Sequence, residues 1–358
     1  MGDPIGPVLD PWNAVPRSSR PSPAGRLGGQ PVRLVDAMST ATFRSTVCVL
    51  SSGDYHFGLA ALVNSLYRNG YRGDVWVGLR GPLPSWAQAA TRRGGQAVLS
   101  VADGCTIRFL DLSFAGRIAL AKPSFMLEVL ERHCPDADAV FYIDADIVVK
   151  CAWSFFEGWV REGVGIGQDM WEPDMSGSHP IRAAWRQLAS RLDLPCRDMH
   201  NYFNAGFVAV PVQHRELLTV WARLIEAAPN LGIPFDDHQP RPPRPYPYLH
   251  TDQDLFNLAV MATNVPLSVV GIQAQFGGGA YLLSHAHGGG WGATKPWRNN
   301  YLLSAARGRP PIGSDHVFWR HADGPIRPYS RARLRWTWLQ IRLAQAIGRF
   351  YCRPQEPM

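Results

Sequence analysis

Hydrophobic and polar positions along this chain alternate in the way that successive strands and helices require. Residues 45–50 form a short, largely apolar run that is typical of a buried strand, and a polar turn follows it. Apolar residues then recur at helical spacing until Gly70, and glycine commonly ends a helix. The next strand-like run covers residues 74–79. This β-α-β order predicts a parallel sheet with a right-handed crossover.

The same alternation continues through the middle of the chain and predicts an α/β fold. The expected helices cover residues 122–133, 216–228 and 251–263. The expected strands cover residues 139–143, 164–166, 204–210, 265–272 and 281–287. We therefore expect a mostly parallel central sheet with flanking helices, in one domain that spans residues 41–325.

The first segment of the chain differs from this pattern. Residues 1–40 are rich in Pro, Gly, Ser and Arg and show neither a helical nor a strand period. We interpret them as a disordered leader, or as the product of a misassigned start codon with translation beginning at Met38.

The last segment, residues 326–358, has the pattern of a basic amphipathic helix. On a helix, its arginines fall on one narrow stripe and its apolar side chains cover a broad face. These residues are Arg331, Arg335, Arg342 and Arg349 on the stripe, and Leu339, Ile341, Leu343, Ile347 and Phe350 on the face. The segment is either a last helix packed on the domain or a helix that contacts an anionic membrane through residues 331–350.

The composition is that of a folded, basic protein. Of the 358 residues, 46% are hydrophobic and only 18% are charged, which excludes a largely disordered chain and allows a sizeable core. The formal net charge of +7 favours anionic partners, such as nucleotide diphosphates, anionic lipids or nucleic acid, without choosing among them.

The cysteines and the N-terminal sequence indicate a cytoplasmic protein. None of the 6 cysteines belongs to a CxxC pair or to a zinc-type spacing, so we expect reduced thiols. No apolar run approaches the roughly 20 residues that a membrane span needs. The N-terminus also lacks the basic region and apolar stretch of a signal peptide. A peripheral place on the inner face of the membrane is the alternative if the C-terminal helix binds lipid.

The strongest local signal is a pair of acidic residues directly after an apolar strand. Residues 139–143 are apolar, and Asp144 and Asp146 follow with one residue between them. In open α/β sheets, ligands bind beyond the carboxyl ends of the strands. Two carboxylates directed at one point there suit Mn²⁺ or Mg²⁺, and such an ion neutralises a diphosphate leaving group. A solvated turn after the strand is the alternative interpretation.

Residues 141–149 (FYIDADIVV) resemble the DxD segment of glycosyltransferases with the GT-A fold, in particular glycosyltransferase family 8. That family includes glycogenin and bacterial lipooligosaccharide galactosyltransferases. Three further segments follow in the family's order: residues 202–206, residues 252–257 and residues 285–297. The resemblance spans about residues 45–298. It implies a GT-A, Rossmann-like fold and a retaining transfer of a hexose from a nucleotide sugar, with a UDP-sugar as the expected donor.

By this resemblance, the first β-α turn holds the nucleotide base. Tyr55 would stack on the base, and Ser52 and Asp54 would lie near its edge or the ribose. The family often has an acidic residue where Ser52 stands, so the identity of the base stays open. An ordinary turn, with Asp54 near a helix N-terminus, is the alternative.

The resemblance also places three residues beside the transferred sugar. In the family, Asn204 lies near this sugar, and Asp252 and Gln253 contact its hydroxyls and the reaction face. The glycine that follows Asn204-Ala205 lets the backbone approach a ligand closely. The alternative for residues 204–206 is an ordinary turn at the start of a strand. The alternative for residues 251–254 is a helix cap.

The glycine-rich segment before Lys295 carries the remaining candidates. His285 or His287 would be the third metal ligand, since imidazole binds Mn²⁺ together with carboxylates, and both remain candidates. The loop is longer here than in the family pattern. Lys295 would hold the diphosphate as a point charge. Lys122, at the start of a helix, is a candidate for diphosphate or sugar contact and is equally well explained as a surface lysine.

We therefore expect a metal-dependent glycosyltransferase with a glycan, lipid-linked or small-molecule acceptor and no nucleic-acid partner. A sugar nucleotidyltransferase would also use carboxylates and Mg²⁺, but that class usually carries a basic glycine-rich loop after its first strand. Residues 51–54 contain no Lys or Arg, which argues against it. A non-catalytic carbohydrate-binding protein, the third alternative, would not need the paired carboxylates.

Overall fold

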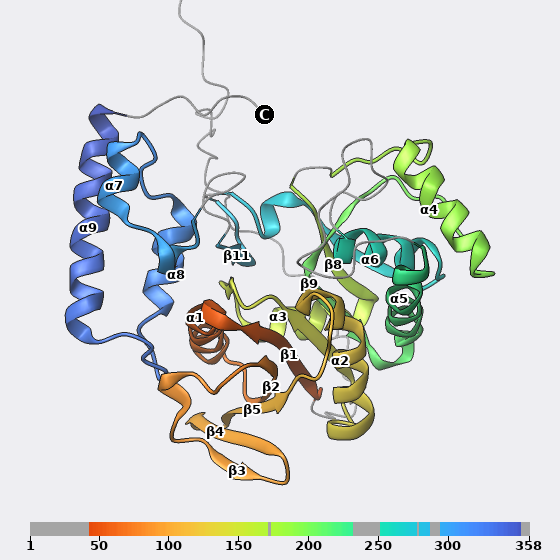
Figure 1. Ribbon diagram of the computed structural model, residues 1–358, viewed down its shortest axis with the longest axis horizontal. Helices are drawn as coiled ribbons and strands as arrows, with labels where there is room; N and C mark the ends of the chain where they lie inside the picture. Colours follow the sequence, from red (N-terminus) through yellow and green to blue (C-terminus); the bar gives the residue numbers. More distant parts are fainter. Residues whose placement is uncertain (1–42, 171–172, 232–250, 278, 287–293, 352–358) are drawn as a thin grey trace, which may run out of the picture. The chain divides into compact units, whose positions relative to one another are not determined.

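The structure, a computed structural model, describes residues 43–170, 173–231, 251–277, 279–286 and 294–351. Its centre is a nine-stranded sheet with the order β10-β8-β9-β6-β1-β2-β5-β4-β3 (Figure 1). These strands are β1 (Ser45–Ser52), β2 (Gly73–Arg80), β3 (Thr91–Arg93), β4 (Gln96–Ala102), β5 (Cys105–Asp111), β6 (Ala139–Ile143), β8 (Val164–Gln168), β9 (Phe203–Pro211) and β10 (Leu267–Val270). A separate two-stranded ribbon joins β7 (Ile147–Val149) to β11 (Leu283–His285).

The central sheet is mostly parallel, as the sequence predicts. Strand β1 pairs in parallel with β2 on one side and with β6 on the other. Strands β2 and β5, and strands β8 and β10, are also parallel pairs. Only β9 and β4 run against the others, because each is antiparallel to both of its neighbours in the sheet. The first β-α-β unit of the chain thus has the predicted parallel pairing.

Helices cover both faces of this sheet, which explains why its central strands are nearly continuous apolar runs. The helices are α1 (His56–Arg68), α2 (Lys122–Glu128), α3 (Trp153–Trp159), α4 (Pro180–Arg191), α5 (Glu216–Ala227) and α6 (Thr251–Met261). One core joins α2, α5 and α6 to alternate residues of the strands, such as Val140 and Val208. The other core joins α1 and α3 to the residues between them, such as Phe141 and Phe207.

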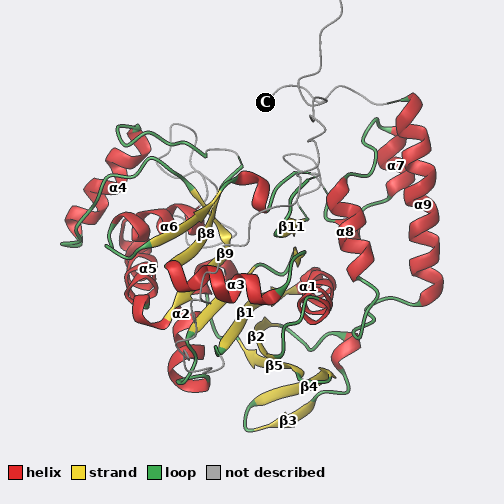
Figure 2. Cartoon of the chain, turned by 180° about the vertical axis from the view of Figure 1, so that it is seen from behind, coloured by secondary structure: helices red, strands yellow, loops and turns green. Residues whose placement is uncertain are grey.

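Three further helices form a third core. They are α7 (Tyr301–Ala306), α8 (Gly313–His321) and α9 (Arg331–Phe350), and they lie together in both views (Figures 1 and 2). Tyr301, Phe318, Trp319 and Ile341 are buried in this core, together with Ala61 of α1. The core therefore connects the three helices to α1, beside the sheet.

The C-terminal helix α9 has two apolar faces. Leu334, Ile341 and Ala344 are buried against the third core, so the packed helix that the sequence offered as one alternative is present. The opposite face is exposed, and it carries large apolar side chains: Trp336 at 54% exposure, Leu339 and Leu343 at 46%, Ile347 at 37% and Phe350 at 92%. The packing of α9 against the domain thus leaves this second face exposed and able to contact another surface.

The structure differs from the sequence predictions in several secondary-structure elements. The periodicity does not predict the β4–β5 hairpin or the helices α3, α4, α7 and α8, and strand β11 is shorter than expected. The proposed leader, residues 1–40, lies outside the described residues. None of the described helices is long and apolar enough to cross a membrane.

Candidate active site

The acidic pair lies in the turn between β6 and β7, at the carboxyl end of a buried strand. The Asp144 amide donates a hydrogen bond to the Gly206 carbonyl at 2.7 Å, and the Ala286 amide donates to the Asp146 carbonyl at 2.9 Å. Strand β7 pairs with β11 so that Ile147 stands opposite His285. The turn is thereby fixed from two sides, and the ribbon brings His285 to the acidic pair.

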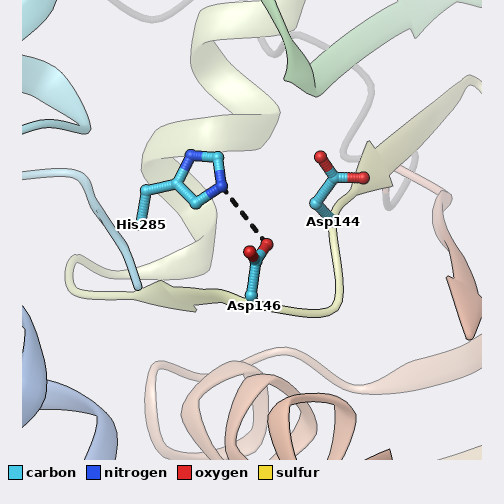
Figure 3. Close-up of side chains that lie close together, drawn as sticks. All are labelled: Asp144, Asp146 and His285. Atoms are coloured by element: carbon cyan, nitrogen blue, oxygen red, sulfur yellow. Dashed lines mark ion pairs between the residues drawn. The ribbon is translucent and has the colours of Figure 1, made fainter. Parts of the chain in front are cut away.

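Asp144, Asp146 and His285 lie close together, with Asp144 beside the facing pair of Asp146 and His285 (Figure 3). One ligand atom from each residue lies within 4.8 Å of the others, and His285 Nε2 lies 3.2 Å from Asp146 Oδ1. Asp146 and His285 are buried, whereas Asp144 is partly exposed. Two carboxylates and one imidazole are a donor set that fits Mn²⁺ or Mg²⁺. His287, the other candidate ligand, lies outside the described residues.

The absence of a side chain at Gly206 leaves space beside this point. A Cβ atom at residue 206 would lie 2.8 Å from Asn204 Oδ1, 3.0 Å from Asp144 Oδ2 and 3.2 Å from the His285 ring. These distances are shorter than ordinary van der Waals contacts. Glycine is therefore required here for the carboxylate and the imidazole to take these positions.

Two lysines neutralise the acidic cluster. Lys122 is only 3% exposed, and its Nζ lies 3.3 Å from Asp144 Oδ1, 3.1 Å from Asp252 Oδ2 and 3.0 Å from the Ala205 carbonyl oxygen. Lys295 Nζ contacts Asp146 Oδ2 and donates to the Ala286 carbonyl at 3.2 Å. Lys122 is thus a buried member of the site, and its interpretation as a surface lysine is wrong.

The pKa values follow from these contacts. Burial by itself would lower the pKa of Lys122, but Asp144 and Asp252 outweigh it and raise the pKa above its ordinary value. The pKa of Lys295 is raised in the same way, with Asp146 overcoming the effect of burial. Burial would raise the pKa of Asp146, yet Lys295 and His285 hold it well below its usual range. Both amines are therefore charged and Asp146 is ionised at neutral pH.

A buried network of amides stands next to the cluster. The Asn204 amide Nδ2 donates to Gln253 Oε1 at 3.0 Å and to Asp169 Oδ2 at 2.9 Å. Gln253 Nε2 donates to the same Asp169 oxygen at 3.2 Å, and Gln253 Oε1 accepts from the Ala205 amide at 3.1 Å. The network therefore fixes Asn204 and Gln253 relative to the strand that carries Gly206.

Asp169 is the member of this network that the sequence analysis missed. It follows β8 directly, just as Asp144 follows β6, so an apolar strand that runs into an acid was again the available signal. Asp254 follows Gln253 in the sequence and contacts a different residue. It is fully buried and accepts a hydrogen bond from the Tyr202 hydroxyl at 2.7 Å.

A cleft of about 350 Å³ opens onto the acidic turn. Six of the residues singled out in the sequence line it: Ser52, Tyr55, Lys122, Asp144, Asp146 and Asp252. Tyr142 also lines the cleft, and its hydroxyl donates a hydrogen bond to Asp144 Oδ1 at 2.7 Å. The cleft thus combines an aromatic ring, a hydroxyl and the charged cluster.

Asp54 does not line this cleft. Its carboxylate forms an ion pair with Arg298 and accepts a hydrogen bond from Trp297 Nε1 at 3.0 Å. The hydrogen bond from Arg298 is the main reason that the pKa of Asp54 lies below its ordinary value. The Trp297 ring also packs edge-on against Tyr55, with 5.4 Å between centroids. Asp54 therefore ties the first β-α turn to the segment after Lys295, and its expected contact with the base or ribose stays a prediction.

Comparison with known proteins identifies the fold. No protein family and no curated protein matches the sequence. Among solved structures, the chain is similar to the apo form of the bifunctional glycosyltransferase WbbM, with 14% identity, a TM-score of 0.50, and coverage of 85% of this chain and 52% of that chain. The chain therefore spans about half the length of that neighbour.

Two structures of LgtC are also similar to the chain. An active-site mutant matches with 16% identity and a TM-score of 0.45, over 77% of this chain and 95% of that chain. The galactosyltransferase LgtC in complex with donor and acceptor sugar analogs matches with 16% identity and a TM-score of 0.45, over 82% and 99% of the two chains. At such identities, similarity bears on the fold alone. With the WbbM match and the observed sheet, the GT-A fold expected from the sequence is confirmed.

Proposed function

We propose that this protein is a metal-dependent glycosyltransferase that transfers a hexose from a nucleotide sugar, with a UDP-sugar as donor, to an acceptor hydroxyl. The observation that carries the proposal is the meeting of two carboxylates and one imidazole at the edge of a cleft that also holds an amino group and an aromatic ring. A non-catalytic sugar-binding protein would have no need of this arrangement.

In this proposal, Asp144, Asp146 and His285 would hold Mn²⁺ or Mg²⁺, and the bound ion would supply positive charge to the diphosphate leaving group. Lys295 would add a second positive charge at the phosphates, and the contact of its Nζ with Asp146 and its distance of 5.9 Å from the centroid of the Tyr55 ring support this role. Tyr55 and Ser52 line the same cleft and are the proposed contacts of the base.

The transferred sugar is proposed to lie between the metal cluster and the buried amide network. Asp252 faces the cleft, where it would accept hydrogen bonds from sugar hydroxyls while Lys122 fixes its carboxylate. Gln253 and Asn204, held by Asp169, would form the polar wall beside the anomeric carbon. The catalytic contribution of these side chains is positioning and charge stabilisation.

We also propose that the transfer retains the anomeric configuration. The bond between the anomeric carbon and the diphosphate oxygen breaks, and the bond to the acceptor oxygen forms on the same face. The proton of the acceptor hydroxyl passes to the departing phosphate oxygen. Asp252 is engaged by Lys122, and Asp146 by Lys295 and His285, which agrees with a reaction that needs no separate protein base.

The acceptor is proposed to be a glycan or lipid-linked glycan at the membrane surface. The exposed apolar face of α9 lies beside arginines 331, 335, 342 and 349, and the helix contains no Asp or Glu. A surface helix with large apolar side chains and only positive charge is suited to the interface of an anionic bilayer. Such a contact would hold the enzyme at the inner face of the membrane.

The proposed activity predicts that hydrolysis or transfer of a nucleotide sugar depends on Mn²⁺ or Mg²⁺ and on Asp146. The protein is to be incubated with a panel of UDP-, GDP- and TDP-sugars, and the released nucleotide measured with and without metal. Asp146→Asn removes a charged ligand and should lower the rate by about a thousandfold or more, on the scale of lost electrostatic stabilisation.

Asp136→Asn is the matched control, since Asp136 has 80% of its side chain exposed in a surface ion pair. This variant should keep the full rate, and both variants should show the circular dichroism spectrum of the wild type. Full activity of Asp146→Asn, or metal-independent turnover, would contradict the metal site. Metal-dependent binding of a nucleotide sugar without turnover would favour the binding-protein alternative.

A further inference from the structure

A second cavity, of about 530 Å³, lies between the segment after Lys295 and the side of α9. Trp297 links it to the cleft, because this residue lines the cavity while its ring packs against Tyr55 of the cleft. Trp319 of α8 and Trp336 of α9 complete its aromatic lining. None of the residues in the proposed transfer mechanism belongs to this lining.

The lining has the chemistry of a site for neutral, hydroxyl-rich molecules. Asn300, Gln340 and Arg333 line the cavity together with the three tryptophans. Asn300 Oδ1 already accepts a hydrogen bond from the Leu303 amide at 3.1 Å, which leaves its Nδ2 as a donor. An amide both donates and accepts hydrogen bonds, as a sugar hydroxyl does, and the guanidinium donates several. Aromatic rings provide flat apolar surfaces for the C–H face of a sugar. The described lining contains no Asp, Glu, His or Cys, so it offers neither a metal site nor a nucleophile.

The floor of the cavity is rigid, whereas its rim is exposed. Trp319 Nε1 donates to the Tyr301 hydroxyl at 2.7 Å, and that hydroxyl donates to Asp315 Oδ1 at 3.0 Å. Trp297 and Trp319 are 6% and 3% exposed, but Trp336 at the rim is 54% exposed. A preformed aromatic floor with one large exposed ring at its edge is the arrangement expected of a binding site that is completed by its ligand.

We propose that this cavity is a glycan-binding subsite that takes a neutral oligosaccharide, with a sugar stacked on Trp336 and its hydroxyls bound by Gln340, Asn300 and Arg333. The oligosaccharide is the part of the acceptor that lies away from the transferred sugar. This assignment as acceptor rests on the proposed glycosyltransferase function, whereas binding of the oligosaccharide does not.

The test is titration calorimetry of the full-length protein, without metal or donor, with maltotetraose, cellotetraose and lacto-N-neotetraose as probes. Trp336→Ala should weaken binding of the probe that binds by at least about tenfold, and Gln340→Ala by several-fold. Leu343→Ala is the control, because Leu343 is exposed on the same helix and does not line the cavity. It should leave the affinity unchanged, which shows that the effect of Trp336→Ala comes from the cavity and not from any change in α9.

The proposal is overturned if none of the three probes binds at millimolar concentration, or if Trp336→Ala binds as the wild type does. Circular dichroism and the melting temperature show whether each variant is folded. Asp146→Asn should bind the probe normally, so a failure of the transfer proposal is distinguishable from a failure of the subsite. With the bound probe as acceptor, Trp336→Ala should raise KM and leave kcat unchanged, and an unchanged KM would refute the acceptor assignment.

Discussion

Asp169 shows how a single buried residue positions the candidate site. It is 3% exposed, and one of its oxygens accepts hydrogen bonds from both Asn204 and Gln253. A buried carboxylate is tolerated only when such partners satisfy it. Because both amides donate to the same acid, their oxygen atoms are directed toward the backbone of β9. Asp169 thereby sets the orientation of the Asn204 and Gln253 side chains, which we propose to form the polar wall of the site.

Asp169→Asn should disturb this orientation while preserving size. The amide of the new asparagine would face the side-chain amides of Asn204 and Gln253 with either a second donor or a weaker acceptor. We therefore expect a loss of about 1–3 kcal/mol in the free energy of unfolding. Misplacement of Gln253 should lower the transfer rate by up to about a hundredfold. Urea unfolding and the nucleotide-sugar assay measure the two effects.

Asp198→Asn is a suitable control for this substitution. Asp198 has 78% of its side chain exposed in a pair with Arg186, and such surface pairs contribute about 1 kcal/mol or less. The variant should therefore be stable and active. Equal transfer rates for Asp169→Asn and the wild type would remove Asp169 from the positioning network.

At the scale of elements, helix α1 packs directly against the turn that carries Asp144 and Asp146. A Cβ atom at Gly58 would lie 2.3 Å from the Ala145 carbonyl oxygen and 3.1 Å from the Trp297 ring. The helix can approach the turn this closely only because residue 58 has no side chain. The position of the carboxylates proposed to bind the metal thus depends on a packing contact with the first helix of the chain.

Gly58→Ala should displace the turn, because the atom in the way belongs to the backbone. In an isolated helix the same change would stabilise by about 1 kcal/mol. Here the overlap should instead cost about 1–3 kcal/mol, and metal-dependent turnover should fall with it. Thermal unfolding and titration of Mn²⁺ in the activity assay would detect both changes.

Gly158→Ala provides the comparison, since Gly158 lies in α3 and a Cβ atom there meets nothing within 4 Å. It should be neutral or stabilising by up to about 1 kcal/mol. If the two alanine variants behave alike, close packing of α1 on the turn is not important for the site.

At the scale of the whole molecule, positive charge and apolar surface coincide on α9. The chain has a formal net charge of +7, and the arginines at 331, 333, 335, 342 and 349 in α9 are unaccompanied by any acid in that helix. Since one face of α9 is packed against α7 and α8, the helix can meet a bilayer with its other face without unfolding. Deletion of the tail would instead expose the buried core around Tyr301 and Trp319.

Single substitutions on the outer face therefore give the cleaner prediction. Leu343→Glu and Phe350→Glu should reduce co-sedimentation with vesicles that contain phosphatidylglycerol by about tenfold, because each places a negative charge against an anionic surface. Binding of the wild type should weaken as salt rises and be lost on phosphatidylcholine vesicles.

Phe155→Glu is the matched control, because Phe155 of α3 is 45% exposed, close to the 46% of Leu343. It should co-sediment as the wild type does. Wild-type protein that stays in the supernatant, or a Leu343→Glu variant that binds normally, would refute membrane contact through α9.

The sequence determined the order of the central elements and the place of the acidic pair. Both depend on local periodicity: the run before Asp144 and the helical spacing of α1 are visible without knowledge of any partner. The β4–β5 hairpin was missed although β5 alternates buried and partly exposed residues, and the short helices α3 and α7 were missed because so few residues carry little periodic signal. The C-terminal helix was predicted, and its packing against the domain was one of two alternatives that the sequence left open.

The tertiary structure decided which distant residues meet. The register of β7 and β11 brings His285 to Asp146, and the burial of Lys122 follows from the carboxylates of Asp144 and Asp252, which lie far apart in sequence. The same holds for the pair of Asp54 with Arg298. These contacts depend on strand order and register, which the periodicity of one sequence does not encode. The residue types in the sequence therefore predicted which chemical groups the candidate site contains. The arrangement of these groups in space depends on the fold.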